Sequence, residues 1–211
     1  MVLVDLTREI SEDTPVFPCY PRVKIIVWSK HDVHGFGSEL LFAPTHVSTH
    51  MDAPLHFKAG GKSIDETPLE LMIGYAVVID AMGHHVVPGS VVEKGLAQTG
   101  FRRGDAVFVY TGWEDRYGSP EYVIECPGLS EDAARKLVEA GASIVGIDSP
   151  SIDPGDSTEF PAHHVLLGAG VPVIENLCNL GGLVGRRLRY YALPLKIKGA
   201  TASPIRVLVE A

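Results

Sequence analysis

Short apolar runs alternate along the chain with segments that have helical spacing. Tyr75–Ala81 and Ala106–Thr111 are apolar and rich in β-branched residues, which predicts two buried strands. Glu131–Ala140 has apolar residues at helical spacing, with Ser130 before it as an N-cap and Gly141 after it as a stop. This alternation predicts an α/β fold in which helices flank a mixed β-sheet.

The same criteria predict the remaining elements. Further strands are expected at Val2–Leu6, Val23–Trp28, Glu39–Ala43, Ile144–Ile147, Val171–Ile174, Tyr190–Leu195 and Ile205–Val209. Further helices are expected near Leu69–Ile73, at Val91–Thr99 and at His163–Gly168, the first after a capping box at Ser63-Ile-Asp-Glu66. A chain of 211 residues, 45% of them hydrophobic, can bury one substantial core, so we expect a single domain over residues 1–211.

Residues 46–57 alternate with a period of two, but with unusual polar positions. The odd positions are mainly apolar, and the even ones carry four side chains that can bind metal: His46, His50, Asp52 and His56. Such alternation normally separates a buried face of a strand from a solvated one. Here the polar face carries imidazole and carboxylate groups, which form a ligand set for zinc, manganese or iron.

A metal site requires this segment to bend. At roughly 3.3 Å per residue, a straight strand would spread His46 and His56 over about 33 Å. Ala53-Pro54 is the expected bend, because proline fixes φ and lacks an N–H. A helix would turn Asp52 away from the two preceding histidines, so we predict a strand end that runs into a tight loop, with His56 beyond the bend. A half-buried strand with hydrogen-bonded histidines is the alternative, and it explains one histidine better than four ligand-type residues.

A second group of ligand-type residues lies about 110 residues further along the chain. Glu175 follows the apolar run Val171–Ile174, where a carboxylate is costly unless it is paired or bound to a cation. His163 and His164 open the preceding predicted helix. Taken alone, Glu175 suits a surface strand end, and the histidine pair suits a half-exposed helix start. Together with the first group, they provide enough ligands for two metal ions about 3.5–4 Å apart.

The chain resembles the cyclase family of metal-dependent hydrolases, which includes bacterial kynurenine formamidases and isatin hydrolases. Residues 46–56 match its motif His-x-Gly-Thr-His-x-Asp-x-Pro-x-His except at Ser48, which replaces the glycine. Supporting blocks lie at Val4–Ile10, Asp13–Pro18, Thr111–Trp113, Pro127–Ser130, Val145–Ser149 and Leu193–Gly199. The resemblance implies the family's swivelling β/β/α-like fold and a homodimer or homotetramer.

The resemblance also implies two divalent ions per subunit, zinc or alternatively manganese, held by five side chains: His46, His50, Asp52, His163 and Glu175. Asp52 and Glu175 would be shared between the ions, and His56 would donate and accept protons. Phe17, where the formamidases carry a tryptophan, would contact the substrate. For His164 two roles stay open, an additional site residue or a neighbour of the ligands.

The implied reaction is hydrolysis of a carbon–nitrogen bond in N-formylkynurenine or a related aryl formamide. Isatin-hydrolase-like opening of a lactam or lactone, or a cyclase or dehydratase reaction on the same metal centre, is the alternative. A non-catalytic metal-binding protein is disfavoured, because by resemblance His56 is not a ligand. Cys19-Tyr20 replaces the usual Gly-Asp, which leaves the substrate open, and Ser48 requires a turn that accommodates a Cβ and can add a hydrogen bond.

Composition narrows the classes of partner. The formal net charge is −8 and no long basic run occurs, which argues against a nucleic acid or an anionic membrane as partner. No apolar run approaches the roughly 18 residues that span a bilayer, and charges come too early at the N-terminus for a signal peptide. The three cysteines are far apart and form no paired motif, so we expect reduced thiols in a cytoplasmic protein.

Overall fold

The main sheet of the computed structural model, which describes residues 2–211, has eight strands in the order β1-β12-β11-β5-β7-β9-β10-β4. Their bounds are Leu3–Asp5 (β1), His50–Asp52 (β4), Ile73–Asp80 (β5), Ala106–Tyr110 (β7), Val145–Ile147 (β9), Val173–Glu175 (β10), Arg187–Pro194 (β11) and Ala202–Glu210 (β12). Strands β5, β7, β9 and β10 are parallel to one another, and the other pairs are antiparallel. The predicted mixed α/β sheet is therefore confirmed.

The sheet closes on itself at its shortest strands. β4 pairs with β10 on one side and with the first residues of β12 on the other. β12 is long enough to pair with β4 through Ala202–Pro204 and with β1 through Leu208–Glu210. The closure gives the sheet a barrel-like shape and places β4 against segments from the far C-terminal half of the chain.

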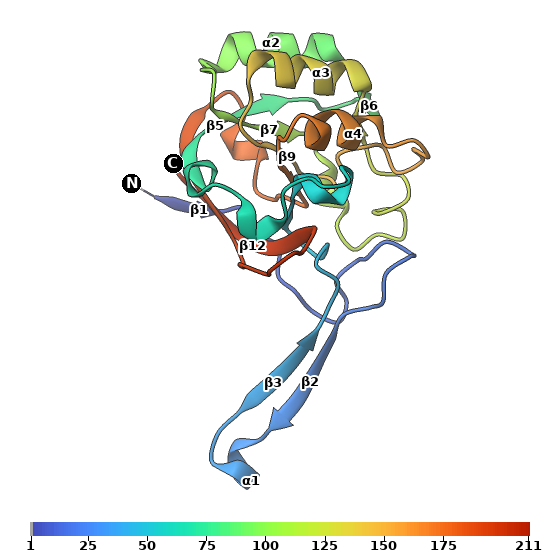
Figure 1. Cartoon of the computed structure of the whole chain (residues 1–211), viewed down its shortest axis with the longest axis vertical. Coiled ribbons are helices and arrows are strands. Elements are labelled where there is room, and N and C mark those ends of the chain that lie inside the picture. The colour runs from blue at the N-terminus through green and yellow to red at the C-terminus, as the bar shows by residue number, and fades with distance from the viewer. Residues whose placement is uncertain (1) are drawn as a thin grey trace.

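Three helices cover the outside of this sheet: α2 (Gly89–Thr99), α3 (Glu131–Ala140) and α4 (Pro161–Gly168), as Figure 1 shows. One core cluster lies between helices and sheet and includes Ile79, Leu137 and Leu166. A second cluster contains Met51 and Tyr190 and packs on the sheet's other face. The apolar positions that predicted these helices therefore face the buried layer between the helices and the sheet.

Helix α3 has the predicted ends. The Ser130 hydroxyl accepts a hydrogen bond from the Ala133 N–H, and Gly141 adopts a left-handed φ of 83°. The helix predicted near Leu69–Ile73 is wrong, because only the 3₁₀ turns η2 (Ile64–Glu66) and η3 (Leu69–Leu71) form there before β5. Pro68 separates the two turns, since it lacks an N–H and holds the preceding Thr67 in an extended conformation.

The other short elements are the 3₁₀ turns η1 (Pro54–His56), η4 (Trp113–Arg116) and η5 (Gly181–Leu183) and the paired strands β6 (Val86–Val87) and β8 (Gly128–Leu129). Across residues 2–211, no helix is both long enough and apolar enough to cross a membrane.

A hairpin arm projects away from the body of the molecule (Figure 1). It consists of β2 (Lys24–Ser29), the short helix α1 (His31–His34) at its tip, and β3 (Ser38–Phe42). The two strands form, as predicted, but they pair only with each other and do not join the main sheet. Apolar side chains are exposed on both faces of the arm: Ile25, Ile26, Val27, Trp28, Leu40, Leu41 and Phe42.

Candidate metal centre

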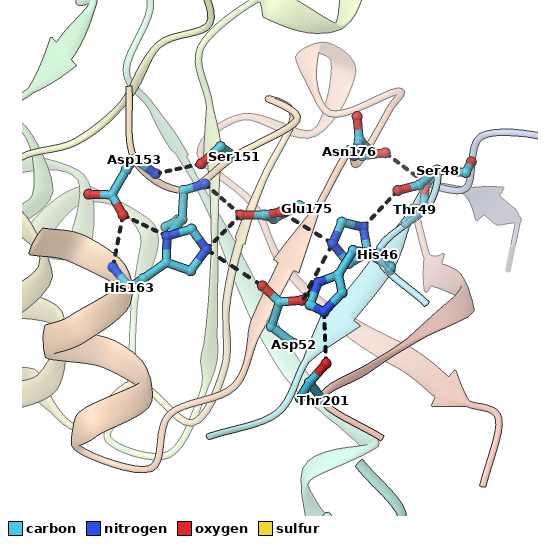
Figure 2. Close-up of polar contacts among 12 residues, drawn as sticks. His46, Ser48, Thr49, Asp52, Ser151, Asp153, His163, Glu175, Asn176 and Thr201 are labelled. Carbon is cyan, nitrogen blue, oxygen red and sulfur yellow. Dashed lines mark hydrogen bonds and ion pairs between the residues drawn. The ribbon is translucent and has the colours of Figure 1, made fainter. Parts of the chain in front are cut away.

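The pairing of β4 with β10 brings the two predicted ligand groups together. Glu175 lies directly opposite His50 in the antiparallel register, and His50 and Asp52 share one face of β4 because they are two residues apart. The His50 Nε2 lies 3.3 Å from the Glu175 Oε2 and 3.4 Å from the Asp52 Oδ1. Figure 2 shows the Asp52 and Glu175 side chains directed toward the same region.

Two further histidines complete the group from outside the sheet. His46 lies in the bend before β4, and its Nδ1 is 2.8 Å from the Asp52 Oδ1. His163 lies in the first turn of α4, and its Nε2 is 3.2 Å from the Glu175 Oε1 and 3.6 Å from the Asp52 Oδ2. The structure thus gathers all five residues that the resemblance named as ligands.

The first ligand segment bends twice. Pro54 opens η1 directly after β4, at the predicted place, and η1 carries His56. The second bend is at Ser48, whose φ of 54° is left-handed. The single hydrogen of the Ser48 hydroxyl is shared between the carbonyl oxygens of Arg8 (2.9 Å) and Glu9 (3.0 Å), so the expectation of a tolerated Cβ and an added hydrogen bond is confirmed. The Ser48 carbonyl in turn accepts the His50 Nδ1–H, which directs the Nε2 toward the carboxylates.

Three buried polar atoms of the group form no well-aligned hydrogen bond among residues 2–211, although imidazole nitrogens lie 2.8–3.6 Å from the Asp52 oxygens. They are the His50 Nε2 and both carboxylate oxygens of Asp52, which is fully buried. An unsatisfied buried carboxylate is costly and rare, and a bound cation would satisfy it. Ligand atoms of His50, Asp52 and Glu175 all lie within 4.8 Å of one another. The nitrogen and oxygen donor set therefore fits a divalent metal ion.

The charges of this group depend on one another. Burial alone would lower the pKa of His50, but the Asp52 and Glu175 carboxylates outweigh it and raise that pKa to about 9. Burial likewise opposes the charge of His163, whose pKa is nevertheless raised by Asp153, Asp52 and Glu175. Protonated imidazoles thus balance the two buried carboxylates when no metal is bound. Metal ions must displace these protons, because an imidazole binds metal only through a deprotonated nitrogen.

His56 differs from the other histidines in both exposure and charge. It is half-buried beyond the bend, with its ring centroid 4.1 Å from that of His46 and 5.8 Å from that of His163. Burial lowers the pKa of His56 to about 4, and the nearby Asp52 opposes this shift only in part. The ring is therefore neutral at pH 7 and has a free lone pair, although it is a weaker base than an ordinary histidine. One His56 nitrogen also lies within 4.8 Å of ligand atoms of His46 and Asp52, so distance alone permits a ligand role.

A cavity of about 200 Å³ opens above the group. His46, His50, His56, His163 and Glu175 line its polar side, and its apolar walls include Phe17, Tyr20, Phe57, Val123 and Phe160. Tyr20 stacks on His46 with ring centroids 5.9 Å apart. Phe17 thus lies on the cavity wall. His164 is exposed and lines a separate surface groove, although its ring contacts the edge of Phe57.

Two residues that hold the histidines had no role assigned from the sequence. The Asp153 Oδ2 lies 2.6 Å from the His163 Nδ1, and the Thr201 Oγ1 lies 2.9 Å from the His46 Nε2. Both belong to loop segments, and a single polar residue in a loop carries no periodic signal. The one available signal for Asp153 is its place ten residues before a ligand-type histidine at a helix start.

A comparison with known families identifies the chain. The cyclase family model matches residues 4–154, which is more than half of the sequence. The chain belongs to the cyclase family. The matched residues include the first ligand segment and Asp153. The second ligand segment lies outside the match, and the pairing of β10 with β4 brings it to the same site.

Individual relatives of this cyclase-family chain are hydrolases. It is 34% identical to the kynurenine formamidase of Salinibacter ruber, over all of the chain and 98% of that protein, and 31% identical to that of Geobacillus thermodenitrificans, over 98% and 96%. Isatin hydrolase A of Labrenzia aggregata, solved with benzyl benzoate, superposes with a TM-score of 0.90 at 28% identity, over 99% of this chain and 93% of that one. The chain is therefore a metal-dependent hydrolase.

We predict that the metal-free protein loses stability as the pH rises from about 6.5 toward 9. A histidine whose pKa is raised by folding stabilises the fold below its unfolded pKa, and this contribution disappears as the pH rises through its folded pKa. For His50 these two values are 6.5 and about 9. Thermal unfolding of chelator-treated protein across this range measures the effect, with metal-loaded protein as the control. A melting temperature of the metal-free protein that rises with pH would contradict the prediction.

Proposed function

We propose that this cyclase-family hydrolase cleaves the amide bond of N-formylkynurenine or a related aryl formamide. The observation that carries the proposal is a pair of buried carboxylates: Glu175 lines a cavity with aromatic walls, and Asp52 lies fully buried beside it. The relatives called kynurenine formamidase cover the whole chain and support this substrate class. A role in tryptophan catabolism would follow from that substrate.

We infer two divalent ions per subunit, zinc or alternatively manganese, held by His46, His50, Asp52, His163 and Glu175. Asp52 approaches histidines of both ligand segments through its two oxygens, which supports a ligand shared between two ions. When bound, such ions lower the pKa of water and polarise a carbonyl group.

His56 is the proposed proton carrier of the reaction. It is neutral, it lines the cavity, and it lies beside the ligand histidines. In this role its free nitrogen takes the proton of the attacking water and passes it to the leaving nitrogen of the substrate. The aromatic walls orient the aryl group and exclude water from the opposite side of the cavity.

We predict that His56→Ala loses about 10²–10⁴ in the rate of N-formylkynurenine hydrolysis and keeps its metal, because a proton carrier is removed and no ligand. Turnover and elemental analysis of the same preparation measure both quantities. Glu175→Gln should lose metal and activity together, and the exposed His164→Ala should keep both. A metal-free His56→Ala would show that His56 is a ligand, and a fully active one would remove its catalytic role.

Ring opening of isatin is the second candidate activity. The isatin hydrolase solved with thioisatinate covers 98% of this chain with a TM-score of 0.89 at 25% identity. A bicyclic lactam presents a planar aryl group and a carbonyl to the site, as an aryl formamide does. The specificity constants for N-formylkynurenine, isatin and a simple lactone rank the candidates, and a dehydration product would identify a cyclase or dehydratase instead.

Phe17 is proposed to contact the aryl group of the substrate from the cavity wall. We predict that Phe17→Ala weakens the binding of aryl substrates by about 0.5–1.5 kcal/mol for the lost ring contact, seen as a higher KM with a similar kcat. Pro18→Ala, at an exposed position of the same loop outside the cavity, is the control. An unchanged KM for aryl substrates would show that Phe17 packs only against its own loop.

The hairpin arm supports a homo-oligomer, either a dimer or a tetramer. Ile25 and Leu41 pair on one face of the arm and Ile26 and Leu40 on the other, and all four are exposed. A two-stranded hairpin is marginally stable alone, so an arm with two apolar faces needs a cover that the described part of this chain does not supply. We propose that a second copy provides it. The negative net charge argues against a nucleic acid or an anionic membrane as the cover.

We predict that Ile26→Asp dissociates the oligomer, since a carboxylate would replace an apolar contact worth about 1.5–3 kcal/mol per protomer. Light scattering over a range of protein concentrations measures the mass. Glu39→Gln, on β3 of the same arm, should leave the mass unchanged. A wild-type protein that remains a monomer at all concentrations would refute the proposed assembly.

A cytoplasmic location also remains a proposal. The three cysteines of the described chain are all free thiols, as expected in a reducing compartment.

A further inference from the structure

Asp153 is fully buried, and its side chain makes three polar contacts, all of them with the start of α4. Its Oδ1 accepts the Ala162 N–H at 2.8 Å, and its Oδ2 accepts the His163 N–H at 3.0 Å. The same Oδ2 lies 2.6 Å from the His163 Nδ1. Backbone N–H groups can only donate, so both oxygens of Asp153 must act as acceptors.

This arrangement decides which nitrogen of His163 carries the proton. A neutral imidazole has one nitrogen that carries a proton and one that carries a lone pair. The nitrogen with the shorter contact to an acceptor oxygen is the one that carries the proton. The Nδ1 faces a carboxylate oxygen at 2.6 Å, whereas the Nε2 lies 3.2 Å from the Glu175 Oε1. The proton therefore belongs on the Nδ1, and the lone pair of the Nε2 points toward Asp52 and Glu175 (Figure 2).

The backbone around Asp153 is held as firmly as its side chain. A Cβ on Gly128 of β8 would lie 2.2 Å from the Asp153 carbonyl carbon, so only glycine permits this close approach. The Leu129 N–H donates to the Ile152 carbonyl at 2.7 Å, and the Ile152 N–H donates to the Glu175 Oε1, also at 2.7 Å. The segment thus holds Glu175 and His163 in position at once.

We propose that Asp153 is a positioning residue, which fixes the tautomer and the direction of His163 so that its Nε2 is ready to bind metal. The proposal rests on the metal centre proposed above. His50 is fixed in the same sense by the Ser48 carbonyl, which can only accept. His46 faces the Thr201 hydroxyl, which can donate or accept and fixes no tautomer. Asp153 is therefore the only charged side chain that holds the outer nitrogen of one of these three histidines in the described chain.

A purely structural role is the competing explanation, because Asp153 also satisfies two N–H groups at the start of α4. Such a role affects the stability of the fold alone. A positioning role also affects zinc affinity and the His163 tautomer. Asp153→Asn separates the two explanations. Its side-chain amide keeps one acceptor oxygen, but its NH₂ group donates and would face an N–H that the carboxylate oxygen accepted.

Asp148→Asn is the matched control. Asp148 is also fully buried and accepts the N–H and the hydroxyl of Thr111, at 2.8 and 2.7 Å, but it contacts none of the proposed ligands. Both variants lose a buried carboxylate and should melt at lower temperature. In a chelator competition with Zn²⁺, Asp153→Asn should bind about 10–100-fold more weakly than wild type, and Asp148→Asn should keep the wild-type affinity.

Nitrogen NMR of ¹⁵N-histidine-labelled wild type tests the tautomer without any metal. At a pH that deprotonates the ring, we expect the His163 proton on the Nδ1. Wild-type zinc affinity in Asp153→Asn, or a proton on the Nε2 in the wild type, would overturn the proposal. The NMR result decides even if Asp153→Asn fails to fold. A wild type that binds no zinc would refute the proposed metal centre. The His163 tautomer seen by NMR would still show whether Asp153 places the proton on the Nδ1.

Discussion

Two carboxylates buried side by side are the constraint on which the rest of this structure depends. Asp52 and Glu175 repel each other and are both removed from water, so the fold must provide positive charge or lose stability. Histidines provide it in the metal-free state, and metal ions can replace their protons. The same arrangement that makes the site costly to fold therefore makes it suited to divalent cations. Neither ligand segment could form the site alone.

The closed sheet meets this constraint by geometry. Strand β4 has only three residues, yet both of its edges are paired, with β10 and with β12. Backbone hydrogen bonds thus fix His50 and Asp52 relative to Glu175 to within the register of an antiparallel pair. His46 and His163 then approach from a bend and from a helix start, where the backbone is free to direct side chains toward the gap.

The sequence predicted well what depends on local pattern. The caps of α3 follow from single residues such as Ser130, and the strands β5 and β7 follow from their continuous apolar runs. Residue types in two short segments indicated a metal site, and the family resemblance supplied the five candidate ligands that the structure brings together. The sequence could not predict the partners of β2 and β3, the closure through β4 or the role of Asp153, because each depends on contacts between distant parts of the chain. The predicted capping box at Ser63–Glu66 forms, but it caps the 3₁₀ turn η2, and Pro68 prevents this turn from continuing as a helix through Leu69.

Ser48 has a consequence for the coupling between metal and substrate contacts. Serine has fewer conformations than glycine in the unfolded chain, so it loses less entropy on folding, which offsets part of the strain of its left-handed backbone. Its hydroxyl also ties the ligand bend to Arg8 and Glu9, upstream of the segment that carries Phe17. The Arg8 N–H also donates to the Thr49 hydroxyl at 2.9 Å, so Ser48 adds a second tie between the bend and the N-terminal segment. A movement of the N-terminal segment must therefore break the shared Ser48 hydrogen bond or carry the His50 backbone with it, which couples the segment that carries Phe17 to the candidate ligands.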